Sequence, residues 1–196
     1  MEAQLLILRV QRDTEKGDDT MCFNLADAEK SLRGFEKFTA PAIKFAFGAK
    51  TIVPTERHET ELEILLDRQG IDGLIVTVDG WTFSYASRVQ FGKNYGAFTI
   101  RRSRPSGVAT EYDKLKNPLQ MKPTYHVQTF IDNDSAANSA ATVAVVPTLE
   151  LMKYVNEHQD QWRKTRDGET FYFVPFNDVA AKIYRIDSDG HVFEKK

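Results

Sequence analysis

The segment from residue 55 to residue 104 most constrains what this chain can fold into, because it predicts one helix followed by three short antiparallel strands. Thr55 offers a side-chain oxygen that can cap a helix, and the helical pattern runs through Arg68. Gly70 follows, at the position where glycine commonly ends a helix. This order of a helix and then a sheet predicts an α/β protein.

Three strand patterns follow that helix. Residues 71–78 are apolar and β-branched, as in a strand that is covered on both faces. Asp79-Gly80 predicts a two-residue hairpin turn, which returns the chain as a strand over residues 82–91. A second turn over residues 92–96 leads to a third strand over residues 97–102.

The rest of the chain alternates strand and helix patterns without a repeat or a linker, so its 196 residues predict a single domain. The expected fold is a mixed central sheet flanked by helices. Its other predicted elements are a strand over 5–11, an amphipathic helix over 24–38, an apolar but irregular segment over 39–54, a helix over 110–116, strands over 124–132, 142–146 and 170–175, a helix over 148–158, and a C-terminal hairpin of strands 183–187 and 191–194.

Composition excludes several classes of protein. Hydrophobic residues make up 41% and charged residues 28%, which is ordinary for a globular protein, and the net charge of -2 indicates no partner. No stretch approaches the roughly 18 apolar residues that a membrane span needs, and the N-terminus lacks a signal-peptide pattern. Cys22 is the single cysteine, which favours a reducing compartment, so we expect a cytoplasmic protein.

The charge is nevertheless uneven along the chain. Not one Asp or Glu lies between Gly80 and Thr110. The five cations of this stretch are Arg88, Lys93, Arg101, Arg102 and Arg104. Arg and Lys attract phosphate oxygens whatever the base sequence, so the last four are expected to bind nucleic acid. The alternative is that they form the solvated face of a sheet.

The order of helix, glycine, strand starting Ile71-Asp72, hairpin and third strand resembles the core of the PD-(D/E)XK nucleases. The resemblance covers residues 55–131 and extends to about residue 175. It implies a restriction-endonuclease-like core with an added N-terminal strand and helix and a C-terminal hairpin. It also implies Mg²⁺-dependent hydrolysis of DNA or RNA, in which the metal polarises the phosphodiester and activates a water molecule.

Matched by position, Asp72 corresponds to the strand Asp of the family and Glu61 to its helix acid, with Glu59 and Glu63 as rivals. Both are expected to bind Mg²⁺, which prefers carboxylate oxygens and water. A two-residue turn at Asp79-Gly80 would pair Asp72 with Ser87, where the family's carboxylate is missing.

A shift of one residue in the hairpin register would bring Arg88 and Gln90 onto the face of Asp72. Arg88 would then replace the family's lysine, and Gln90 would serve as a neutral oxygen ligand. His126, on a later strand, could border the same cleft and act as a general base.

The missing carboxylate leaves a second hypothesis, a catalytically inactive relative that binds nucleic acid or a protein partner. The resemblance is also compatible with a homodimer. Structural roles stay open for the site residues: Asp72 could pair with Arg68, Glu61 could be an exposed helix residue, and Arg88 could pair with the acidic helix.

Overall fold

The computed structural model describes residues 25–55, 60–133, 139–165 and 167–195. The strand predicted over residues 5–11, and Cys22, lie outside the described residues. The helices are α2 (Leu25–Gly34), the π-helical turn η1 (Phe35–Thr39), α3 (Ala40–Phe47), α4 (Glu61–Arg68), α5 (Glu111–Lys116), α6 (Thr148–Glu157) and the short 3-10 helix η2 (Phe176–Asp178).

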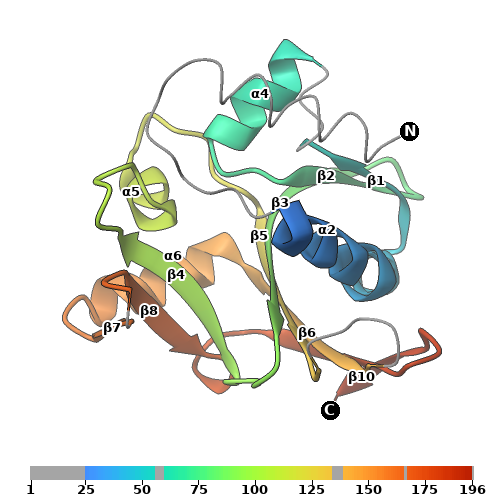
Figure 1. Cartoon of the computed structure of the whole chain (residues 1–196). Helices are drawn as coiled ribbons and strands as arrows, with labels where there is room; N and C mark the ends of the chain where they lie inside the picture. The colour runs from blue at the N-terminus through green and yellow to red at the C-terminus, as the bar shows by residue number, and fades with distance from the viewer. Residues whose placement is uncertain (1–24, 56–59, 134–138, 166, 196) are drawn as a thin grey trace.

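The strands form two sheets (Figure 1). The large sheet has the order β1-β2-β3-β5-β6-β9-β10, and the small sheet has the order β4-β8-β7. The predicted α/β class with a mixed sheet is confirmed, because β3 and β5 pair in parallel while the other neighbours pair antiparallel. The strands are β1 (Ala49–Pro54), β2 (Gly73–Thr77), β3 (Thr82–Phe91), β4 (Ala97–Ser103), β5 (Tyr125–Ile131), β6 (Ala141–Pro147), β7 (Trp162–Lys164), β8 (Thr170–Pro175), β9 (Lys182–Ile186) and β10 (Val192–Lys195).

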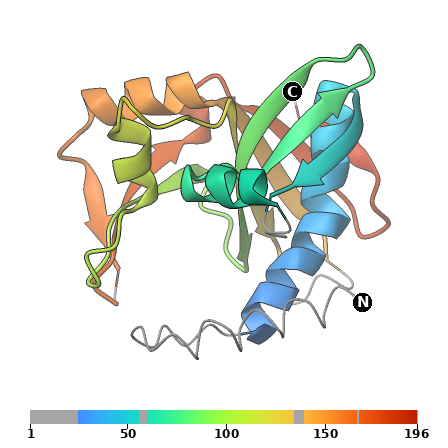
Figure 2. The same ribbon diagram turned by 90° about the horizontal axis from the view of Figure 1, so that it is seen from above.

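Each face of the large sheet carries its own core. Strand β6 supplies Val143 and Val145 to the core beneath α2, η1 and α3, and Ala144 and Val146 to the core shared with α5, α6 and the small sheet. This alternation is the two-residue period of a strand. Figure 2 shows the two groups of helices on opposite sides of the molecule.

The N-terminal helical run is longer than predicted, since residues 39–54 are regular rather than irregular. Pro41 stands in the first turn of α3, directly after the π-helical turn η1. Gly48, with φ 58°, ends α3 and leads into β1. Gly34 lets the run lie close to the sheet, because an added Cβ would approach Ile131 to 2.7 Å and Val89 to 2.9 Å.

Helix α4 begins later than predicted. Thr60, not Thr55, is its N-cap: the Thr60 hydroxyl accepts the Glu63 N–H at 3.2 Å, and the Glu63 carboxylate accepts the Thr60 N–H at 3.0 Å. This reciprocal pair satisfies two donors that a single cap would not. Thr55 instead donates its hydroxyl to the Ile71 carbonyl at 2.6 Å.

The hairpin register also differs from the prediction. The Thr77 N–H donates to the Trp81 carbonyl at 2.9 Å, so the turn spans residues 78–80. Gly80, with φ 85°, takes the left-handed position that closes such a three-residue loop. Gly73 pairs with Tyr85, and continuing this register places Asp72 opposite Ala86 rather than Ser87.

The prediction that residues 97–102 form a third antiparallel strand beside the hairpin was wrong. Strand β4 leaves the large sheet and pairs with β8, while β3 takes β5 as its other neighbour. Phe98 and Ile100 of β4 explain this, because both are buried in the second core, which also contains Leu151 and Val174. Helix α5 then carries the chain back to the large sheet.

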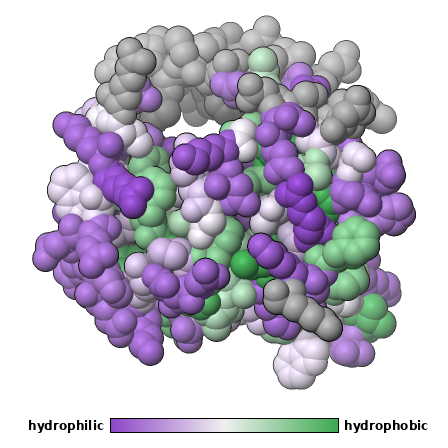
Figure 3. All heavy atoms as spheres, turned by 90° about the horizontal axis from the view of Figure 1, so that it is seen from below, coloured by the Kyte–Doolittle hydropathy of each residue, from purple (hydrophilic) through white to green (hydrophobic). Residues whose placement is uncertain are grey.

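The described surface is largely polar. In Figure 3, hydrophilic side chains cover most of the described part of the face seen from below, with hydrophobic ones between them. Among the described helices, none has both the length and the apolar character required to cross a membrane.

An arginine-lined cavity as the candidate functional site

A cavity of about 400 Å³ lies where the α4–β2 connection, β3, β4, α5 and the start of β5 meet. Four basic side chains, three carboxylates and one imidazole line it. They are Arg88, Arg101, Arg104, Lys114, Asp67, Asp72, Glu111 and His126. This concentration of charge in one hollow makes it the candidate site.

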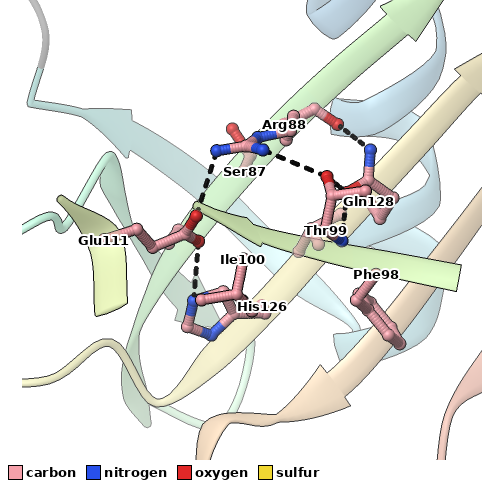
Figure 4. Close-up of a pocket in the computed structure, with 10 residues that line it drawn as sticks. Ser87, Arg88, Phe98, Thr99, Ile100, Glu111, His126 and Gln128 are labelled. Atoms are coloured by element: carbon pink, nitrogen blue, oxygen red, sulfur yellow. Dashed lines mark hydrogen bonds and ion pairs between the residues drawn. The ribbon is translucent and has the colours of Figure 1, made fainter. Parts of the chain in front are cut away.

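Glu111 lies at the centre of these groups. It is the first residue of α5, whose start is fixed by a capping box between Thr110 and Asp113. Its Oε2 accepts from Arg88 Nη2 at 3.0 Å and from the Arg101 backbone N–H at 3.3 Å. Its Oε1 lies 3.3 Å from His126 Nε2. Figure 4 shows the carboxylate between Arg88 of β3 and His126 of β5.

The surroundings of Glu111 keep it ionised. Burial by itself would raise the pKa of Glu111, but the charge of Arg88 and the contact with His126 lower that pKa to about 2. A carboxylate with this pKa is negatively charged throughout the neutral range. Glu111 is therefore charged at neutral pH and pairs with Arg88 as its counter-ion.

His126 is held on one side and faces the cavity on the other. Its side chain is buried, and its Nδ1 lies 2.9 Å from the Thr148 hydroxyl at the start of α6. Its Nε2 is near Glu111 but not aligned for a hydrogen bond. His126 does border the same cavity as Asp72, as expected. Its role as a general base stays a prediction.

Two of the arginines are fixed by the same aromatic ring. The guanidinium carbons of Arg88 and Arg101 lie 5.5 Å and 5.4 Å from the centre of the Phe171 ring. Arg88 also donates to the Thr99 hydroxyl at 3.1 Å, and Arg101 Nε lies 3.2 Å from a Glu169 oxygen. A cation–π contact of this kind attracts a guanidinium to the ring while leaving its charge available.

The arginines are close enough to affect one another. Burial and then the charge of Arg88 lower the pKa of Arg101, Arg104 lowers it further, and Glu169 and Glu111 oppose these effects. The Nε of Arg104 is buried and has no hydrogen-bond partner among the described residues. Four cations and three carboxylates thus line the cavity, and Glu169, which pairs with Arg101, adds a fourth carboxylate.

The structure brings together two of the four predicted catalytic residues. Asp72 and Arg88 line the cavity, and Asp72 Oδ2 accepts the Ser87 N–H at 2.6 Å. Glu61 is exposed in the first turn of α4 and does not line the cavity, because α4 places it about 10 Å along the helix from the Arg68 end. Gln90 lies further along β3, with a buried Oε1 that has no partner among the described residues.

The four cations that were predicted to bind nucleic acid are also divided between the cavity and other surfaces. Arg101 and Arg104 line the cavity. Arg102 is on the other face of β4, where it donates to the Tyr172 hydroxyl at 3.3 Å and lies 4.9 Å from the Trp162 ring centre. Lys93 lies in the β3–β4 turn, 5.5 Å from the Tyr95 ring centre. Strand alternation explains why Arg101 and Arg102 separate.

Sequence reasoning missed Glu111 and Lys114. The sequence carries a weak signal for Glu111, which is the first acid after the acid-free stretch and follows the capping residue Thr110. Lys114, one turn later, donates its Nζ to the Asp67 carbonyl at 3.2 Å and so joins α5 to the end of α4.

A separate group of possible metal ligands lies outside the cavity. In the described ranges, Asp187, Asp189 and His191 each offer one ligand atom within 4.8 Å of the others. They belong to the β9–β10 turn, where Asp187 accepts the backbone N–H groups of Asp189 and His191 at 2.9 Å. These bonds account for the cluster as part of the turn.

Comparison with family models, curated proteins and solved structures finds no match to this chain. The function of the cavity must therefore be inferred from its own chemistry. Its main feature is the convergence of guanidinium groups around one carboxylate.

Proposed function

We propose that the protein binds DNA or RNA through phosphate groups that enter the arginine-lined cavity. The observation that carries this proposal is the convergence of Arg88, Arg101 and Arg104 on one hollow, close enough for Arg88 and Arg104 to lower the pKa of Arg101. Cations packed together in this way are stabilised by an added anion. Guanidinium groups match the geometry of phosphate oxygens.

The cavity and the fold support a nucleic acid as the source of the phosphate. A volume of about 400 Å³ is in the range that holds a small-molecule unit such as one nucleotide. Of the elements on which the resemblance to PD-(D/E)XK nucleases rests, the helix α4 and the β2–β3 hairpin are present in the predicted order, whereas β4 pairs with β8 instead of forming the third antiparallel strand. A cytoplasmic location and a homodimer stay part of the proposal.

The test is a binding measurement with fluorescein-labelled oligonucleotides, as single and double strands of DNA and RNA. Arg101→Gln and Arg104→Gln should each weaken binding by about tenfold, which corresponds to one lost charged contact. Arg33→Gln is the matched control, since this side chain is 66% exposed on α2 and paired with Glu29. The proposal would be contradicted if Arg101→Gln and Arg104→Gln bound the oligonucleotides as tightly as Arg33→Gln does.

Metal-dependent phosphodiester hydrolysis is a second candidate function, favoured by one observation. Asp72 and Glu111 both line the cavity beside Arg88, so a second carboxylate is present although Ala86 stands where β3 would supply one. Carboxylate oxygens fit Mg²⁺, and these two residues, not Glu61, would hold it. The ion would polarise the phosphodiester and lower the pKa of a bound water.

In that function the residues of the chain have distinct tasks. Arg88 would stabilise the charge that develops on the phosphate, and Asp72 would be held in place by the Ser87 N–H. The test compares nuclease activity with Mg²⁺ or Mn²⁺ in the wild type, in Asp72→Asn and in Asp67→Asn. Activity that survives equally in both variants would exclude Asp72 from the chemistry.

A further inference from the structure

The guanidinium of Arg88 already holds an anion that belongs to the protein. Its Nη2 donates to Glu111 at 3.0 Å, and its Nη1 donates to Thr99 at 3.1 Å. Both terminal nitrogens are therefore engaged by groups of the chain itself. A guanidinium has five N–H donors, so three of those of Arg88 are left over, but a phosphate oxygen can accept from the Nη2 hydrogen that bonds Glu111 only where Glu111 gives way.

Of the two acceptors, Glu111 is the one that faces the cavity and can give way. Its side chain is 24% exposed, whereas Thr99 is buried against Gln128. Apart from the bond to Arg88, the carboxylate makes two contacts of 3.3 Å, and the one to His126 is poorly aligned. The long Glu side chain can turn while α5 keeps its place.

Displacing Glu111 would not leave its partners unsatisfied. The Arg101 N–H and the Arg88 guanidinium both point at the position of the Glu111 carboxylate, and a phosphate oxygen there would accept from the same donors. The carboxylate and the phosphate are both anions whose oxygens accept paired N–H bonds from an arginine. In the structure, the Glu111 carboxylate occupies the position that these donors share.

We propose that the Glu111 carboxylate occupies the position that a phosphate of the ligand takes at Arg88, so that Glu111 competes with the ligand for the cavity. This inference rests on the proposed function. It assigns to Glu111 the role of setting the affinity: the residue keeps the arginines paired when the cavity is empty and weakens the binding of any phosphate that enters.

The experiment measures the affinity of the full chain for a labelled single-stranded DNA with a 5′-phosphate and, by calorimetry, for inorganic pyrophosphate. Glu111→Asp is the central variant, because it keeps the net charge and draws the carboxylate back from Arg88. We expect Glu111→Asp to bind about threefold tighter than the wild type and Glu111→Gln about tenfold tighter.

Asp67→Asn is the matched control, since Asp67 also lines the cavity and the variant removes the same charge. It should strengthen binding less than Glu111→Gln does. The gain from Glu111→Gln should also disappear when Arg88→Gln is added. A gain no larger than that of Asp67→Asn, or one that persists without Arg88, would overturn the inference.

The wild type gives a reading that does not depend on any variant folding. On titration with pyrophosphate, the side-chain carboxyl ¹³C resonance of Glu111 should move as the ligand binds, and a resonance that stays in place while calorimetry shows binding would overturn the inference. Failure of the proposed function looks different, because then neither the oligonucleotide nor pyrophosphate binds the wild type or any variant.

Discussion

Oε2 of Glu111 lies 3.0 Å from Nη2 of Arg88, although 23 positions separate the two residues. Glu111 is the first acid after the acid-free stretch, and it pairs with the first arginine of that stretch. The same carboxylate meets His126 and the backbone of Arg101. One side chain therefore organises groups from β3, β4 and β5.

The ion pair between Glu111 and Arg88 should make the free energy of unfolding depend on pH in the acid range. The pKa of Glu111 is lowered from 4.5 to about 2 by folding, so its stabilisation is present above pH 4.5 and is lost as the pH falls towards 2. A shift of this size corresponds to at most about 3 kcal/mol at pH 7. Urea unfolding of the wild type should thus lose more free energy between pH 5 and pH 2.5 than that of Glu111→Gln, and parallel curves would exclude this role.

Thr148 should position His126 without contacting the ligand. Thr148 is buried and its hydroxyl lies 2.9 Å from His126 Nδ1. Replacing Thr148 by Val leaves that nitrogen without a partner and should lower the free energy of unfolding by about 1–3 kcal/mol. Thr148→Ser keeps the hydroxyl and is the control. Equal stability of the two variants would show that the contact contributes nothing.

A terminal phosphate should bind better than an internal one. A phosphomonoester carries about −1.5 to −2 charges at pH 7, so it competes more strongly with the single charge of Glu111 than a phosphodiester does. The measurement compares two oligonucleotides of the same sequence, with a 5′-phosphate and with a 5′-hydroxyl. We expect the phosphorylated strand to bind several-fold tighter. Indistinguishable affinities would point to internal phosphates as the ligand.

The sequence predicts the elements that depend on local pattern. The bounds of β3, from Thr82 to Phe91, agree with the prediction because alternation and flanking turns define them. The turn length at residues 78–80 was missed, since Asp79-Gly80 is compatible with two-residue and three-residue loops. The sheet that β4 joins depends on Phe98 and Ile100 sharing a core with Leu151. Such a long-range relationship is not contained in any local sequence pattern.

The site was predictable to a similar extent. Asp72 and Arg88 could be found because they flank one hairpin, whose register only had to shift by one residue. Glu61 does not line the cavity because only the C-terminal end of α4, at Asp67, reaches it, and Glu61 lies in the first turn of that helix. The role of Glu111 depends on a crossover that returns the chain from β4 to β5, and sequence spacing does not encode it.

The salt dependence of nucleic-acid binding tests phosphate recognition by the cavity most directly. The logarithm of the binding constant should fall linearly with the logarithm of salt concentration, because bound phosphates release counter-ions. Arg104→Gln should reduce that slope by about one, while Arg33→Gln leaves it unchanged. Binding that does not respond to salt, or an equal change of slope in both variants, would contradict a phosphate site at Arg88, Arg101 and Arg104.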